Sequence, residues 1–228
     1  GTVDATSSKL SAQLRALAAS AFEAAPADVV LEEGHLQVRG VPSGAMTLEA
    51  LAQWAIGAKR EAELSATAEF APDDSVFPFG AHLAHVEIDR ETGAVRVLRY
   101  IAVDDCGNVI NPMIVDGQVH GAIAQGLAQA LYEGVEYDED GQLLTGNFTT
   151  YLLPTAADLP RFETDRTVTP SPNNPMGVKG IGEGGTIAST PAVVNAVMDA
   201  LHPFGITNLD MPLTPFKIWD AIARSSGR

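Results

Sequence analysis

Apolar residues recur every three or four positions in several stretches of the chain, which is the spacing of a one-sided helix. The first stretch carries Leu10, Leu14, Leu17 and Phe22, and Pro26 follows where a helix can no longer continue. The same pattern predicts helices over residues 8–25, 47–63, 112–131 and 186–201, and a short helix over 215–223.

Alternation with a period of two predicts strands instead. The longest pair covers residues 81–89 and 94–103, joined by a turn that ends in Gly93. Both faces of the second strand are largely apolar, so we expect this strand at the centre of its sheet. Shorter strands are predicted at 29–31, 36–38, 148–153 and 162–168, the first two as a hairpin. Helices and strands mix without regular alternation, which favours the α+β class.

The candidate domain boundary is the polar, proline-containing stretch at residues 71–75. It predicts a helix–hairpin–helix lobe over residues 1–75 and a second lobe over 76–228. The alternative is that both belong to one continuous domain.

Composition narrows the partners that the chain can have. A net charge of −15 disfavours nucleic acid and anionic membranes, and there is no apolar run long enough for a membrane span. The single cysteine, Cys106, excludes an internal disulfide and a cysteine-based zinc or iron–sulfur site. It also favours a reducing compartment, so we expect a cytoplasmic protein.

The strongest candidate for chemistry is the segment 177–185 (GVKGIGEGG), which holds five glycines in nine residues. Glycine lets a backbone approach a ligand closely, and the start of the helix predicted next suits an anion. Glu183 is either a first-turn residue favoured by the helix dipole or a general base in a desolvated pocket. Lys179 is either a solvated loop charge or a fixed cation beside a phosphate, enolate or pterin oxygen.

Two nucleotide-binding motifs compete for this segment. Its glycines match the spacing G-x-G-x-x-G, but residues 171–176 contain two prolines and two asparagines where a Rossmann fold has a buried strand. The Gly-Lys-Ser/Thr triplet of a phosphate loop is absent. A Rossmann-type oxidoreductase therefore remains a minor alternative.

The helix predicted over residues 112–131 has three faces. They are a small-residue stripe (Gly117, Gly121, Ala124, Ala128), an amide stripe (Gln118, Gln125, Gln129) and an apolar stripe (Val115, Val119, Ile123, Leu127). The small stripe would let another backbone or a flat ligand come close, and the amides need partners if they are buried.

Three further side chains carry weaker signals. Two aspartates precede Cys106, which fits a buried, inert thiol better than a nucleophile. His120 is more typical of a structurally satisfied histidine than of a ligand. His82 and His85 lie on opposite faces of one predicted strand, so they cannot share a metal.

Four segments together resemble the C-terminal part of the catalytic subunit of molybdenum hydroxylases, the xanthine oxidase family, and most of all the large subunit of aerobic carbon monoxide dehydrogenases. They are residues 86–93 (VEIDRETG), 104–112 (DDCGNVINP), 117–126 (GQVHGAIAQG) and 177–196. Their order and spacing fit the family pattern over nearly the whole chain.

The resemblance implies a molybdopterin-binding domain of the xanthine oxidase and aldehyde oxidase type, with mixed sheets and packed helices. It implies that Glu183 stands beside molybdenum and removes a proton. It also implies contacts to a molybdopterin cytosine dinucleotide from Cys106, Gly107, Asn111, Gln118, His120, Gly121, Lys179, Gly180 and Gly182. No side chain of the chain itself is expected to ligate a metal, and copper, although possible, would use a cysteine outside these residues.

The implied activity is oxidation of carbon monoxide, or hydroxylation of an aldehyde or heterocycle with water as the oxygen source. The implied partners are the remainder of the large subunit, iron–sulfur and FAD-binding subunits, and a small-molecule substrate. We expect the 228 residues alone to be inactive. The alternative is a non-catalytic scaffold or subunit-interaction domain that inherited the fold.

Overall fold

The computed structural model describes residues 1–72 and 74–225, and its contacts divide the chain into two compact units, Gly1–Asp74 and Ser75–Arg228. The elements of the first unit are α1 (Thr2–Phe22), β1 (Val29–Glu32), β2 (His35–Val38), β3 (Val41–Thr47) and α2 (Leu48–Gly57), with short 3₁₀ turns η1 (Pro26–Asp28) and η2 (Glu61–Leu64). Its strands form an antiparallel sheet in the order β1-β2-β3.

Local sequence signals explain most of the first unit. Glu33 and Gly34 both adopt positive φ, which suits a tight hairpin turn, and the predicted hairpin is confirmed. Thr47 caps α2 by accepting a hydrogen bond from the Ala50 backbone N–H at 3.1 Å. The prediction that this helix continues to residue 63 is wrong, because the chain turns at Lys59, whose φ is 57°. Strand β3 was not predicted.

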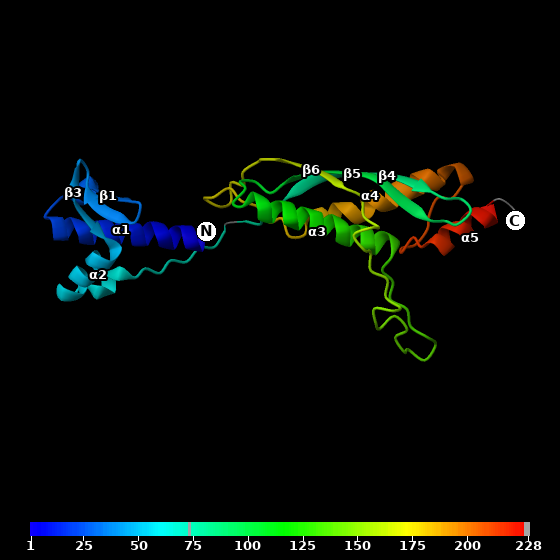
Figure 1. Cartoon of the computed structure of the whole chain (residues 1–228), viewed down its shortest axis with the longest axis horizontal. Helices are drawn as coiled ribbons and strands as arrows, with labels where there is room; N and C mark the ends of the chain where they lie inside the picture. The colour runs from blue at the N-terminus through cyan, green and yellow to red at the C-terminus, as the bar shows by residue number, and fades with distance from the viewer. Residues whose placement is uncertain (73, 226–228) are drawn as a thin grey trace. The chain divides into compact units, whose positions relative to one another are not determined.

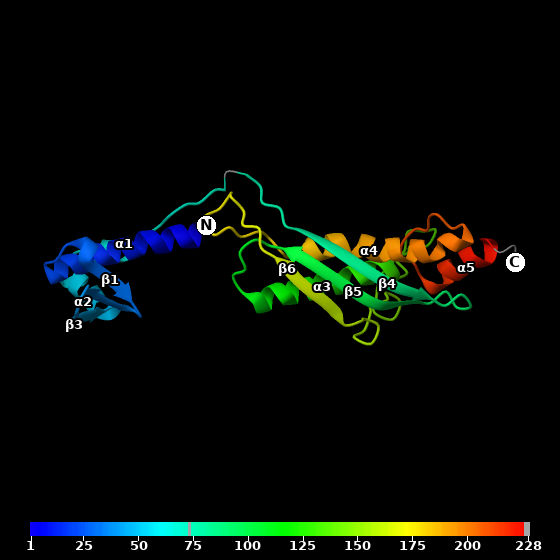
Figure 2. The ribbon, with the colours of Figure 1, turned by 90° about the horizontal axis from the view of Figure 1, so that it is seen from above.

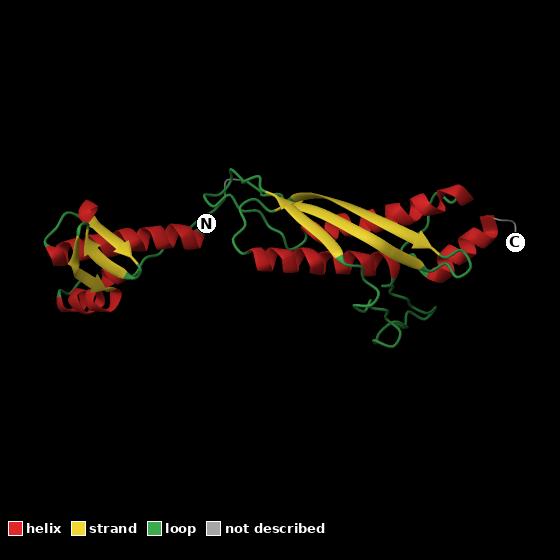
Figure 3. Cartoon of the chain, turned by 45° about the horizontal axis from the view of Figure 1, so that its top comes forward, coloured by secondary structure: helices red, strands yellow, loops and turns green. Residues whose placement is uncertain are grey.

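The second unit is a sheet covered on one face by helices (Figures 1 and 3). Its elements are β4 (Phe79–Ile88), β5 (Val95–Asp105), α3 (Pro112–Leu131), β6 (Phe162–Thr167), α4 (Gly184–Leu201), η3 (His202–Phe204) and α5 (Pro215–Ser225). The strand order is β4-β5-β6, with β4 antiparallel and β6 parallel to β5, so the predicted central position of β5 is confirmed. No described helix is long and apolar enough to cross a membrane.

Between α3 and β6 the chain leaves the helix end as a long loop and returns to the sheet edge (Figures 1 and 2). The strand predicted at 148–153 is wrong: these residues form turns, in which the backbone N–H groups of Thr150 and Tyr151 bond to the Asn147 carbonyl oxygen. Six alternating residues are not enough for a strand where no neighbouring strand supplies a ladder.

The core of the second unit lies where α3 and α4 pack on each other and on the sheet. Its buried members include Tyr100, Ala102, Ile123, Leu127, Val193, Val197, Leu201, Leu213 and Ile218. The two helices approach closely at Gly126, where a Cβ would overlap the Ser189 hydroxyl, and at Gly185, where a Cβ would lie 2.8 Å from Ala122. These close contacts use residues outside the predicted small-residue stripe, whereas Gly117 and Gly121 of that stripe face open space.

Gly126→Ala should lower the free energy of unfolding of the unit 75–228 by about 2 kcal/mol, because the added methyl group pushes α3 and α4 apart. The matched control is Gly121→Ala in the same helix, whose Cβ would meet no heavy atom within 4 Å. It should raise stability by up to ~1 kcal/mol through helix propensity. Urea unfolding followed by circular dichroism measures both, and equal effects would contradict this account of the packing.

Candidate functional site

A buried ion pair joins the end of β5 to the glycine-rich segment 177–185. The Asp105 carboxylate accepts hydrogen bonds from the Lys179 Nζ at 3.0 Å, the Gly107 backbone N–H at 2.9 Å and the Thr167 hydroxyl at 2.9 Å. The Asp105 side chain is 0% exposed and that of Lys179 7%. The ammonium group also lies 4.3 Å from the centre of the Phe79 ring. Of the two interpretations that the sequence allowed for Lys179, the solvated loop charge is therefore wrong.

The pKa of Asp105 follows from this arrangement. Burial by itself would raise it, but hydrogen bonds from the Gly107 N–H, Lys179, Thr169 and Thr167 lower it well below the usual range. The carboxylate therefore stays ionised and can hold several donors at once. Those donors come from β6, from the loop after β6 and from the glycine segment, so one buried charge organises several stretches of chain.

Backbone contacts reinforce the same junction. The Lys179 N–H donates to the Cys106 carbonyl oxygen at 2.8 Å, and the Asn108 N–H donates to the Gly177 carbonyl oxygen at 3.0 Å. Gly107 has a φ of 66°, and a Cβ there would overlap the Gly177 carbonyl oxygen. Only glycine adopts a positive φ readily and has no Cβ to collide, which explains why position 107 after β5 is a glycine.

Glu183 stands where α4 begins, beside the exposed face of α3. Its carbonyl oxygen accepts from the Ile187 N–H at 3.1 Å, and its side chain makes no capping hydrogen bond. The neighbouring Gly182 lies against α3, since a Cβ there would be 3.9 Å from Gln118 Oε1. Glu183 is exposed, so the described residues do not by themselves form the desolvated pocket that a buried general base needs.

The other candidate residues are distributed around this point. Gln118 and Gly121 are exposed on α3, and Gly180 is exposed with open space around its Cα. Asn111 caps α3 through its side-chain oxygen, which accepts from the Ile114 N–H at 3.3 Å. Cys106 is buried, and burial followed by the neighbouring aspartates raises the pKa of its thiol, which confirms the prediction that it is not an activated nucleophile.

His120 makes its contacts with β6. Its Nε2 lies 3.2 Å from the Thr164 hydroxyl, and its ring meets the edge of Phe162 at a centroid distance of 5.8 Å. The structure therefore places Cys106 and Gly107 beside Lys179, and Gly182 near Gln118, whereas His120 contacts β6.

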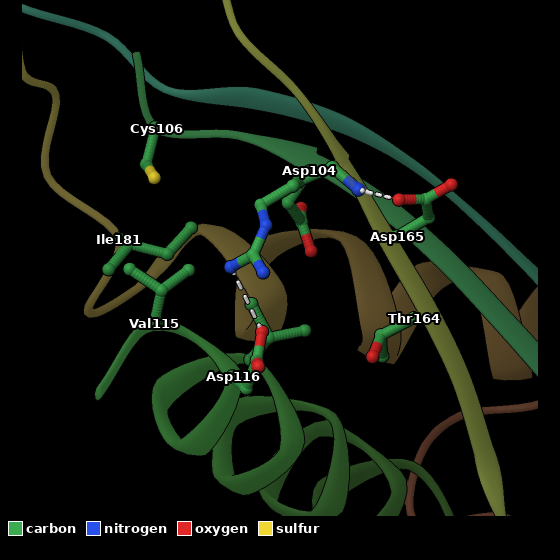
Figure 4. Close-up of a pocket in the computed structure, with 9 residues that line it drawn as sticks. Asp104, Cys106, Val115, Asp116, Thr164, Asp165 and Ile181 are labelled. Carbon is green, nitrogen blue, oxygen red and sulfur yellow. Dashed lines mark hydrogen bonds and ion pairs between the residues drawn. The ribbon is translucent and has the colours of Figure 1, made fainter. Parts of the chain in front are cut away.

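A cavity of about 130 Å³ lies between the ends of β5 and β6, the first half of α3 and the glycine segment (Figure 4). It is lined by Asp104, Cys106, Val115, Asp116, Val119, Thr164, Asp165, Arg166 and Ile181. The Arg166 guanidinium donates to Asp116 at 3.2 Å across it. Sequence analysis missed its charged lining. In the sequence, only the Asp104-Asp105 pair at the end of a predicted strand pointed to these charges. That pair was interpreted only through its effect on the Cys106 thiol.

Comparisons with known proteins agree on one family. Residues 1–160 match the model of the molybdopterin cofactor-binding domain. The carbon monoxide dehydrogenase large chain of Hydrogenophaga pseudoflava is 40% identical over 217 residues, which cover 94% of this chain and 27% of that protein.

Two solved structures share the fold. A crystal structure of a Cu,Mo-CO dehydrogenase matches with a TM-score of 0.84 at 34% identity, covering 97% of this chain and 28% of that one. Quinoline 2-oxidoreductase from Pseudomonas putida 86 matches with a TM-score of 0.82 at 42% identity, covering 94% and 28%. The chain thus spans little more than a quarter of the length of these relatives.

The α+β fold agrees with these matches. The family model covers well over half of the chain. The chain belongs to the molybdopterin cofactor-binding domain family. This domain is a part of molybdenum hydroxylase large subunits, among them the carbon monoxide dehydrogenase large chains.

Proposed function

We propose that this chain is the part of a molybdenum-dependent large subunit that presents Glu183 to the reacting substrate. The whole subunit would oxidise carbon monoxide, or hydroxylate an aldehyde or a heterocycle with water as the oxygen source. The observation that carries the proposal is the junction at Lys179, which holds the segment bearing Glu183 against the end of β5, while Gly182 lies beside Gln118.

The residues present suit a molybdopterin cytosine dinucleotide. Gly180 and Gly182 are exposed and lie outside helices, so their backbone N–H groups are accessible to phosphate and pterin oxygens, and the exposed Gln118 amide can both donate and accept. The residues proposed to hold it are Cys106, Gly107, Asn111, Gln118, His120, Gly121, Gly180 and Gly182, with Lys179 acting through Asp105. When bound, the cofactor supplies the two-electron oxidation of the substrate carbon. Among the described residues no group of three or more His, Cys, Asp or Glu side chains is placed to hold a metal ion.

Glu183 is proposed to accept and return the proton that this chemistry displaces. Glu183 precedes the first turn of α4, and its side chain makes no capping hydrogen bond, so the carboxylate is not engaged with its own helix. The remaining part of the large subunit would cover the exposed face of α3 and remove Glu183 from water.

Electrons released by the oxidation need acceptors that this chain does not contain. With one cysteine, it cannot hold an iron–sulfur cluster by itself, so iron–sulfur and FAD-binding subunits are the proposed partners. The cytoplasm is the proposed compartment. The relatives' names include both carbon monoxide and quinoline as substrates, and either class is compatible with the site. The second candidate function is a non-catalytic scaffold, in which Glu183 would also be an exposed side chain.

In the assembled enzyme, Glu183→Gln should leave the molybdenum content unchanged and lower kcat by at least about a hundredfold, because the amide keeps the size of the side chain but cannot accept the proton. Elemental analysis and turnover of carbon monoxide or quinoline with an artificial electron acceptor measure the two quantities. Glu87→Gln, on the exposed face of β4, is the matched control and should behave as wild type. Full turnover in Glu183→Gln would rule out the base, and a wild-type complex without molybdenum would favour the scaffold.

Lys179→Met should lower the free energy of unfolding of the unit 75–228 by about 3 kcal/mol, because it leaves the buried Asp105 carboxylate without its counter-charge. The pKa of Asp105 is lowered in the folded chain, so its stabilising effect is complete above the ordinary aspartate pKa of about 3.9 and is lost as the pH falls below it. The deficit of the variant should therefore shrink in acid.

Arg96→Met is the control for this prediction. It breaks an ion pair with Glu87 whose partners are 70% and 58% exposed, and such pairs contribute less than ~1 kcal/mol. Urea unfolding at pH 7 and at pH 3, which lies below the ordinary aspartate pKa, tests both variants. A Lys179 deficit no larger than that of the control, or one that grows in acid, would contradict the assigned role of the buried pair.

A further inference from the structure

The chain at the start of β4 contacts the glycine-rich segment at two places. The ring centre of Phe79, the first residue of β4, lies 4.3 Å from the Lys179 ammonium. One residue earlier, the Pro78 side chain lies 3.9 Å from the position that a Cβ on Gly184 would take. These two contacts fall on either side of the proposed base, which none of the sequence signals connected with β4.

The sheet register accounts for the first contact. Phe79 on β4 pairs with Asp105 on β5, and Asp105 pairs with Thr167 on β6. Directly opposed residues present their side chains on the same face, so these three form one row across the end of the sheet. The Lys179 ammonium contacts two members of this row, the carboxylate at 3.0 Å and the aromatic ring.

The exposure of the two partners indicates what the ring does. Phe79 is 56% exposed, whereas the Lys179 side chain is only 7% exposed. A ring that leaves this much of its surface in water gains little from apolar burial, so the cation beside it explains its position best. A cation–π contact and an ion pair both become stronger where water is excluded, and the ring excludes water from the ammonium.

The second contact lies at the turn that carries Glu183. A Cβ on Gly184 would be 3.6 Å from Ile181 Cδ1, and Ile181 packs against the apolar core. The turn therefore touches the core through Ile181 and the start of β4 through Pro78. Glycines lose more conformational freedom on ordering than other residues, so a turn built from them needs such contacts to stay in one place. Proline suits this role, because its fixed φ leaves little freedom to lose.

We propose that Pro78 and Phe79 are positioning residues for Glu183. Phe79 fixes the chain before the carboxylate through Lys179, and Pro78 fixes the chain after it at Gly184. Because the two are consecutive and Phe79 is already paired in the sheet, both contacts share one rigid support. The link to catalysis rests on the function proposed above, whereas the link to the glycine-rich segment concerns this chain alone.

Hydrogen–deuterium exchange of the 228-residue chain tests the first contact. Phe79→Leu keeps an apolar side chain but removes the ring face. The Lys179 amide, which donates to the Cys106 carbonyl oxygen at 2.8 Å, should then exchange about tenfold faster. Amides 193–201 in the apolar core should not change. The matched control is Phe77→Leu, two residues earlier and 75% exposed, which should leave both regions unchanged.

Pro78→Ala tests the second contact. The Ile187 amide donates to the Glu183 carbonyl oxygen at 3.1 Å, and it should exchange about fivefold faster when the turn loses its support. Unchanged exchange in both Phe79→Leu and Pro78→Ala would overturn the proposal. A uniform increase over residues 75–225 would also overturn it, because that indicates general destabilisation. If Phe79→Leu does not fold, the result from Pro78→Ala decides.

Kinetics of the assembled enzyme test the link to Glu183. Phe79→Leu should lower kcat for carbon monoxide or quinoline about tenfold, with KM and molybdenum content unchanged, since only the placement of the base is altered. Phe79→Tyr keeps the ring face and should retain kcat within about twofold of wild type, which a requirement for apolar volume alone would not produce.

The two readouts separate the two proposals. Faster exchange at the Lys179 amide with undiminished kcat in Phe79→Leu would overturn the positioning role, and so would an equal loss of kcat in Phe79→Tyr. A wild-type complex that lacks molybdenum or turnover would overturn the proposed function instead, and the exchange result would still stand.

Discussion

The second unit depends on one buried charge, the carboxylate of Asp105. A carboxylate that is 0% exposed is stable only if donors surround it, and the chain provides them from Gly107, Thr167 and Lys179. Satisfying Asp105 therefore brings the loop after β5, the end of β6 and the glycine-rich segment to the same place. Residues 74 positions apart in sequence become neighbours for an electrostatic reason, and the candidate site forms where they meet.

The glycines divide into two groups with different physical roles. Gly107, Gly126 and Gly185 are packed so closely that a side chain would collide, and they let backbones approach one another. Gly117, Gly121 and Gly180 are exposed with open space, so packing does not require them. Glycine lowers the stability of a helix. At Gly117 and Gly121 no close contact requires it, so a neighbour outside these residues explains it best. The exposed amides on the same stretch of α3 are consistent with a polar, flat ligand on that face.

Local patterns in the sequence were enough to predict α3, α4, the β4–β5 pair and the hairpin of the first unit, because caps, turn glycines and periodicity act over a few residues. They failed at residues 148–153, where alternation without a neighbouring strand gives turns, and at β3, whose pairing to β2 is tertiary. The sequence also groups Glu183, Lys179 and Gly182 in one segment, and their roles stay predictions. It could not pair Lys179 with Asp105, or His82 with Tyr100, because those contacts depend on sheet register and on the packing of distant helices.

The two consecutive aspartates at the end of β5 lie in different surroundings, and strand geometry alone predicts this. In a strand, neighbouring side chains point to opposite faces, so Asp104 and Asp105 must serve different surroundings. Asp104 turns toward the helices and meets His82, whereas Asp105 meets Thr167 and Lys179. Asp105 thus fixes the chain just before Glu183 through Lys179, whereas Asp104 belongs to a buried hydrogen-bonded group with His82 and Tyr100. A flexible glycine-rich segment that carries a defined acid needs a fixed point nearby, and the buried carboxylate of Asp105 supplies it.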